Sequence, residues 1–190
     1  MTHMHAAAPR FQFVVATILC IFAGAPGATA ETPQEMDTLF AELAQPEGDA
    51  WQAAESDIIR IWSRSGSASA DYLLKRGEAA IDQGDFGAAI GHLTALTDHA
   101  PDFAEGYAMR AAAFYLRGEF GPAMSDFSTT LRLEPRHWPA MTQLATMLEE
   151  MDQDDRAAEA YRQSLTINPH QQDAYDGLAR LEQEMSGIGI

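Results

Sequence analysis

Histidines are the first side chains to test for chemistry, because neutral imidazole is a common metal ligand and general base. Beyond residue 30 the chain carries four of them: His92, His99, His137 and His170. No two stand three or four residues apart, so no helix can present a pair on one face as metal ligands. His137 and His170 follow prolines in predicted loops, and we expect both to be exposed to solvent.

Adjacent carboxylates are the next candidates, and they occur at Glu149-Glu150 and at Asp154-Asp155. Neighbouring residues on a helix point about 100° apart, so adjacency does not build an acid–base pair. The sequence also lacks a glycine-rich phosphate loop and a nucleophile-elbow motif. We therefore predict a protein that is not an enzyme, with no catalytic residue, no metal site and no cofactor.

Prolines at a constant interval indicate that the chain is built from repeated structural elements, and these elements position the other side chains. Pro101, Pro135 and Pro169 are each 34 residues from the next, and a period of this length is typical of stacked repeats. Small residues recur in two registers and large apolar residues in a third: Gly77, Ala111 and Ala145; Ala89, Ala123 and Ala157; Leu93, Phe127 and Tyr161. Small residues let two antiparallel helices approach closely, so each segment is predicted to be a helical hairpin.

The repeated segments resemble the tetratricopeptide repeat family. They read YLLKRGEAAIDQGDFGAAIGHLTALTDHAP, GYAMRAAAFYLRGEFGPAMSDFSTTLRLEP and AMTQLATMLEEMDQDDRAAEAYRQSLTINP, and they match its small–small–aromatic–proline pattern. The resemblance implies an all-α fold: an α-solenoid of three hairpins with an N-terminal helical pair and a C-terminal capping helix. The expected repeat domain covers residues 67–186, with repeats at about 69–102, 103–136 and 137–170 and the capping helix at 171–186.

Residues 31–66 are outside the repeat register but show two apolar stripes of helical period. The second stripe includes Trp51 and Trp62. Terminal units of a solenoid must hide an apolar face that no neighbour covers, so we expect this helical pair to cover the open end of the stack.

The first thirty residues have the pattern of a secretory signal peptide. Arg10 precedes an apolar run from Phe11 to Ala23, and Ala28-Thr29-Ala30 is an A-x-A cleavage site directly before Glu31. We expect export to the periplasm with cleavage after Ala30; the alternative is an uncleaved anchor. Cys20 is the only cysteine, so the mature chain can form no disulfide.

The charge balance excludes two classes of partner. Twelve Lys and Arg against 28 Asp and Glu give a formal net charge of −16. Such a surface repels nucleic-acid phosphates and anionic lipid head groups. We therefore expect a protein or peptide partner, no nucleic acid, and no membrane contact beyond a retained signal anchor.

The family resemblance also implies a binding groove, because the first helix of each hairpin lines the concave face of such a stack. We expect this groove to contain Leu74, Glu78, Asp82, Glu105, Met109, Ala112, Tyr115, Thr142, Thr146 and Glu149. One family mode grips the C-terminal carboxylate of chaperones through Lys and Asn. The matching positions here are Leu74, Glu78, Met109, Pro139 and Gln143, which excludes that mode.

These observations predict an exported scaffold in a Gram-negative envelope that binds a basic, amphipathic polypeptide segment in its concave groove. Two alternatives stay open. One is a self-associating structural protein, in which the two-tryptophan helix or the last helix packs against a copy of itself. The other is the repeat module of an envelope assembly machine, such as that for cytochrome maturation.

Overall fold

The computed structural model describes residues 33–187, and this part of the chain is helical without any strand. The helices are α1 (Pro33–Leu43), α2 (Ala50–Trp62), α3 (Ala68–Asp82), α4 (Phe86–His99), α5 (Ala104–Leu116), α6 (Phe120–Leu133), α7 (Trp138–Glu150), α8 (Asp154–Ile167) and α9 (Gln172–Met185). No helix among the described residues is long and apolar enough to cross a membrane. The predicted signal segment, residues 1–30, lies outside the described residues.

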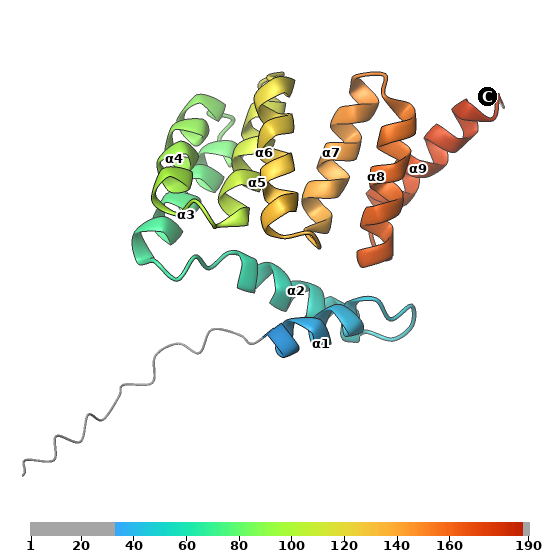
Figure 1. Cartoon of the computed structure of the whole chain (residues 1–190), viewed down its shortest axis with the longest axis horizontal. Coiled ribbons are helices and arrows are strands. Elements are labelled where there is room, and N and C mark those ends of the chain that lie inside the picture. Colours follow the sequence, from blue (N-terminus) through green and yellow to red (C-terminus); the bar gives the residue numbers. More distant parts are fainter. Residues whose placement is uncertain (1–32, 188–190) are drawn as a thin grey trace, which may run out of the picture. The chain divides into compact units, whose positions relative to one another are not determined.

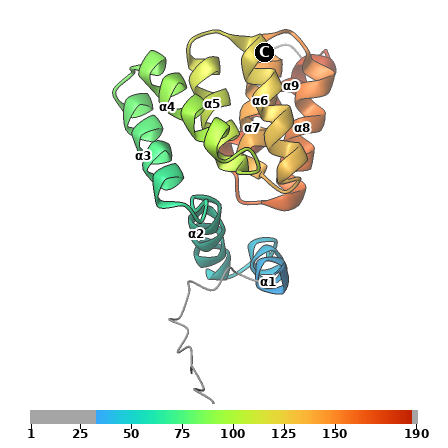
Figure 2. The same cartoon turned by 60° about the vertical axis from the view of Figure 1, so that its left-hand side comes forward.

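Three hairpins, α3–α4, α5–α6 and α7–α8, stand side by side in chain order, and α9 follows them (Figure 1). Each helix packs against the next, and the first helices α3, α5, α7 and α9 also pack against one another. Figure 2 shows the same succession from a second direction. This is the predicted α-solenoid with its final capping helix.

The core confirms the register that the prolines predict. Ala111, Ala123 and Ala145 are completely buried, and so is Phe127 in the large position. Gly77 lies so close to α4 that an added Cβ would come 2.5 Å from Cγ of Leu93. The small positions therefore set the distance between paired helices, as the sequence pattern requires.

The turn inside each hairpin uses a left-handed backbone at one repeated position. Gly84 (φ 72°) and Gly118 (φ 74°) occupy it in the first two hairpins, and Asp152 (φ 54°) occupies it in the third. Glycine adopts this conformation without steric cost, and Asp is among the side chains that tolerate it best. The third turn therefore forms without glycine.

The N-terminal hairpin, α1 and α2, does not cover the open end of the stack, and that expectation is wrong. It lies against the turns that join one repeat to the next, residues 134–138 and 168–171, which we call the proline edge. Trp62 contacts Trp138, with ring centroids 4.8 Å apart, and Trp51 stacks on His170 at 4.0 Å and 7°. In both Figure 1 and Figure 2, α1 and α2 lie below the repeats.

The exposed residues of α3 explain this difference. Tyr72, Lys75 and Arg76 are exposed on α3, the first helix of the stack. The apolar stripe of α2 could not cover them without desolvating two charges. Trp138 and Ile167 of the later repeats offer an apolar surface instead, and both belong to the cluster that contains Trp62. Trp51 and Trp62 thus contact residues of their own chain, while Ile59 of the same helix stays exposed.

Candidate functional site

The surface formed by α3, α5, α7 and α9, which we call the first-helix face, carries the residues predicted to line a groove. Leu74 is the exception. It is 2% exposed and packs in a core cluster with Ala70, Ala80 and Leu93. The prediction that Leu74 contacts a ligand is wrong, because its side chain fills the space between α3 and α4.

Glu78 of α3 is the most informative carboxylate of this face. It is half-buried, and within the described residues it forms no hydrogen bond or ion pair. Burial raises its pKa, as do the nearby charges of Glu105 and Asp82, and Lys75 only partly opposes them. Among the described residues, the α3–α5 half of the face therefore has a negative field that Lys75 offsets only in part.

Apolar side chains lie on the helix next to these acids. Met109 and Ala112 of α5 are partly buried, and Met109 packs against the core between α3 and α4. Tyr115, one turn further along α5, donates its hydroxyl to Glu150. Burial and that hydrogen bond raise the pKa of Tyr115 to about 12, so the phenol is neutral and its proton is donated to Glu150.

The α7–α9 half of the face differs, because its polar groups bond to one another. Thr142 Oγ1 lies 2.7 Å from both Ser164 Oγ and Gln171 Oε1. Thr146 Oγ1 lies 3.0 Å from the hydroxyl of Tyr161. These side chains are thus occupied by partners within the repeat.

Glu149 in the same half is neutralised by α9. Arg180 donates to its two carboxylate oxygens at 2.6 and 2.9 Å, and the Tyr161 hydroxyl donates to it at 3.2 Å. The hydrogen bonds from Arg180 lower the pKa of Glu149. The sequence pattern did not predict this pair, because its two residues are 31 positions apart on different helices.

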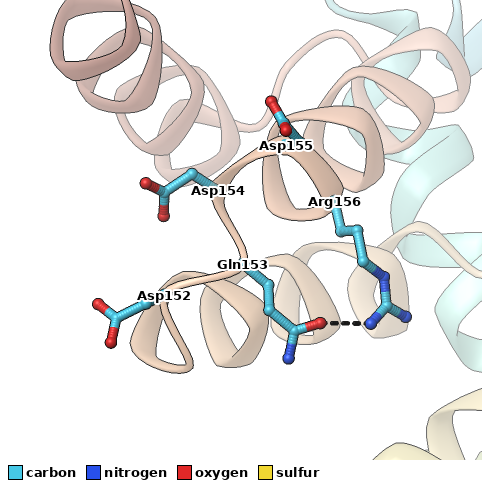
Figure 3. Close-up of a pocket in the computed structure, with 5 residues that line it drawn as sticks. All are labelled: Asp152, Gln153, Asp154, Asp155 and Arg156. Atoms are coloured by element: carbon cyan, nitrogen blue, oxygen red, sulfur yellow. Dashed lines mark hydrogen bonds between the residues drawn. The ribbon is translucent and has the colours of Figure 1, made fainter.

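Two hollows open beside these helices. One, of about 430 Å³, lies between the N-termini of α7 and α9 and is lined by Trp138, Pro139, Thr142, Gln143, Gln171, Gln172 and Asp173. The other, of about 460 Å³, surrounds the acidic turn between α7 and α8. Figure 3 shows that its carboxylates stand apart instead of converging, while Arg156 bonds to Gln153. No group of metal-ligating side chains is found among the described residues.

His137 joins the first-helix face to the N-terminal hairpin, and sequence reasoning missed it. It is 3% exposed, so the expectation of a solvent-exposed histidine is wrong. His137 is the N-cap residue of α7, where its ring is enclosed between Trp62 and the first turn of α5. Its Nε2 lies 2.9 Å from Glu105 Oε2. His170 is also partly buried, by its stack on Trp51.

Comparison with known sequences agrees with the helical architecture. No protein-family model matches the chain. A TPR repeat-containing protein of Rhizobium etli is 28% identical over 161 residues, which span 84% of this chain and 79% of the relative. The chain is thus similar in sequence to tetratricopeptide repeat proteins. Small glutamine-rich tetratricopeptide repeat-containing protein 2 of Mycosarcoma maydis is 28% identical over 63% of this chain, but the match spans only 34% of that relative.

Solved structures of tetratricopeptide repeat domains have the same fold. The first TPR domain of Spaghetti (RPAP3), bound to an HSP90 peptide, aligns with a TM-score of 0.61 at 22% identity, covering 63% of this chain and 95% of that one. MamA aligns over 83% of this chain and 86% of its own length, with a TM-score of 0.59 at 20% identity. The chain therefore has the fold of these solved domains.

Proposed function

We propose that this protein is a non-catalytic scaffold that holds a basic, partly apolar polypeptide segment on its first-helix face. The observation that carries the proposal is Glu78, a half-buried carboxylate without an ion-pair partner among the described residues. Carboxylates with a perturbed pKa cluster at functional sites, which supports a binding role for Glu78. An incoming Lys or Arg would supply the missing cation.

The apolar residues beside Glu78 define the rest of the ligand. Met109 and Ala112 offer contact to an apolar side chain one helical turn from a basic one. Beyond them, the hollow between α7 and α9 presents the amides of Gln143 and Gln172, which suit the neutral backbone or polar side chains of the same segment. The ligand is thus basic where it meets the α3–α5 half.

This preference differs from that of the chaperone-binding relatives. The RPAP3 and yeast Sti1 domains were solved with HSP90 and Hsp70 peptides, and the RPAP3 ligands SRMEEVD and SGPTIEEVD end in the acidic sequence EEVD. At the positions where that binding mode uses Lys and Asn, the present protein has Leu74, Glu78, Met109, Pro139 and Gln143. An acidic peptide would meet like charge at Glu78.

Binding of two synthetic helical peptides tests the proposal: one of leucine and lysine, and one in which glutamate replaces lysine. The lysine peptide should bind, and binding should weaken as salt rises, because charges at the rim of a site are screened. Glu78→Gln should flatten the salt dependence, whereas Met109→Ala should weaken binding at every salt concentration. Glu159→Gln, an exposed change on α8, serves as the control. Equal binding of both peptides would refute the proposal.

We also propose that the protein is exported to the periplasm and that residues 1–30 are removed after Ala30. The support is the sequence pattern of an apolar run followed by an A-x-A site. N-terminal sequencing of the protein from the periplasmic fraction should give Glu31 as the first residue. An intact N-terminus recovered with the membrane fraction would show the retained anchor instead.

A further inference from the structure

We infer that the N-terminal hairpin is part of the binding site, because Trp62 and His137 position Glu105 on the first-helix face. The inference rests on the function proposed above. It makes Trp62 and His137 positioning residues that act through Glu105 without touching the ligand. It also assigns a role to α1 and α2, which lie outside the repeats.

The chain of contacts from the hairpin to the face is continuous. Trp62 at the end of α2 lies flat against His137, with ring centroids 4.5 Å apart and an interplanar angle of 12°. His137 Nε2 meets Glu105 Oε2 at 2.9 Å. Glu105 in turn acts on the pKa of Glu78, so the two carboxylates are electrostatic neighbours. Trp62, His137 and Glu105 therefore connect the hairpin to the acidic part of the face.

The hydrogen bonds of His137 fix which of its nitrogens carries the proton. Nδ1 accepts from the backbone N–H of Ala140 at 3.2 Å, which caps α7. Nε2 is consequently the protonated nitrogen, and it donates to the Glu105 carboxylate. The Glu105 side chain is only 16% exposed, so this bond restricts it to a narrow range of positions.

His170, the second histidine at the proline edge, differs from His137 in its hydrogen-bond partner. His170 also stacks on a tryptophan of α2, Trp51, but its Nε2 bonds to the backbone oxygen of Gln45 and to no carboxylate. Both stacks attach the hairpin to the repeats, and only the His137 stack ends at an acid of the first-helix face. The indole N–H of Trp62 has no hydrogen-bond partner within the described residues, so Trp62 acts on His137 through its ring.

Two substitutions of His137 separate positioning of Glu105 from capping of α7. His137→Asn keeps an acceptor near the place of Nδ1 and so keeps the cap, but it loses the donor to Glu105. His137→Gln places an amide N–H near the position of Nε2 and so keeps the donor, but it loses the cap. His170→Asn is the matched control, because it breaks a stack of the same kind away from the acids.

The probe is the leucine–lysine helical peptide, titrated at low and high salt. His137→Asn should weaken binding at low salt by about three- to tenfold and flatten the salt dependence. His137→Gln should bind nearly as the unaltered protein does, although it melts at a lower temperature. His170→Asn should leave binding unchanged. The reverse order, with His137→Gln the weaker binder, would reduce His137 to a helix cap and overturn the inference.

A measurement without ligand keeps the inference separate from the proposed function. In the free protein the Nε2 proton of His137 should exchange slowly by NMR, and its resonance should move in both Trp62→Phe and Glu105→Gln. If both NMR results are obtained while neither peptide binds, His137 does position Glu105, and the proposed function is wrong. If the proton exchanges as fast as in a free imidazole, the inference fails whatever the peptides do.

Discussion

Arg110 of α5 and Asp126 of α6 form a two-point ion pair in the interior of the stack. The guanidinium Nε lies 2.7 Å from Oδ2, and Nη2 lies 2.9 Å from Oδ1. Nη1 also donates to Thr97 of α4 at 2.7 Å, so one arginine joins three helices of two repeats. Both charged side chains are largely buried, and removal of either partner would leave the other uncompensated.

We expect Asp126→Ala to lower the free energy of unfolding by roughly 2–4 kcal/mol, because Arg110 would stay buried without its carboxylate. The hydrogen bonds that Arg110 donates to Asp126 raise the pKa of Arg110, so this stabilisation is complete below the ordinary guanidinium pKa. It is lost only as the pH rises through the raised value, far above neutrality. Urea denaturation at neutral pH measures the loss. Glu119→Ala, which breaks an exposed pair with Arg117, should cost less than about 1 kcal/mol; equal losses would contradict the argument.

A pair of glycine substitutions tests the packing between repeats. An added Cβ at Gly177 of α9 would lie 2.5 Å from Cζ of Tyr161, whose hydroxyl is held by Thr146 and Glu149. Gly177→Ala should therefore cost about 1–3 kcal/mol. Gly91 of α4 has nothing within 4 Å of its added Cβ, and Gly91→Ala should stabilise by up to about 1 kcal/mol through helix propensity. Thermal unfolding of both variants should show shifts of opposite sign.

The stacked hairpins were predictable because their packing repeats at short range. One position of the repeat holds a small residue that is buried against the preceding repeat: Gly106, Ala140 and Ala174. The same position in the first repeat is Tyr72, which is exposed because no repeat precedes it. The same packing requirement recurs every 34 residues in three repeats, so the register could be predicted from the sequence.

The place of the N-terminal hairpin was not predictable in the same way. It depends on pairs such as Trp62 and His137, which come from distant segments, and a loop histidine looks the same in sequence whether it meets water or an indole. One signal was present: the turn pair His137-Trp138 departs from Phe103-Ala104 and Gln171-Gln172 at the matching positions. An aromatic pair at a single repeat turn indicates a contact that the other turns lack.

The tryptophans supply a direct test of hairpin docking. All three, Trp51, Trp62 and Trp138, lie in the contact between the hairpin and the proline edge. Arg136 of that edge lies 3.9 Å from the ring centre of Phe40 and pairs with Asp37 of α1 at 2.7 Å. Arg136→Ala should loosen the hairpin, shift the tryptophan emission to longer wavelength and cost about 0.5–1.5 kcal/mol.

Arg132→Ala, at an exposed position on α6, is the control for this measurement. It should leave the emission unchanged, because its side chain lies on a different part of the repeat. An identical spectrum for the Arg136 variant and the unaltered protein would mean that the cation–π contact does not hold α1 in place.

Glu78 and Glu149 should respond in opposite directions when each is replaced by glutamine. The pKa of Glu78 is raised above its ordinary value of 4.5, so the folded state binds its proton more tightly than the unfolded chain does, and stability falls as the pH rises through that window. Glu78→Gln should therefore stabilise the protein at pH 7 by about 0.5 kcal/mol, a gain that disappears below pH 4.5.

The pKa of Glu149 is lowered by Arg180, so its stabilisation is present above pH 4.5 and is lost as the pH falls through the lowered value. Glu149→Gln should cost about 0.5–1 kcal/mol at pH 7 and progressively less in acid. Melting temperatures of both variants between pH 3 and pH 8 decide the matter. A carboxylate whose removal stabilises the fold but abolishes salt-dependent peptide binding is kept for the ligand, whereas a loss of stability at pH 7 in both variants would show that Glu78 is a structural residue.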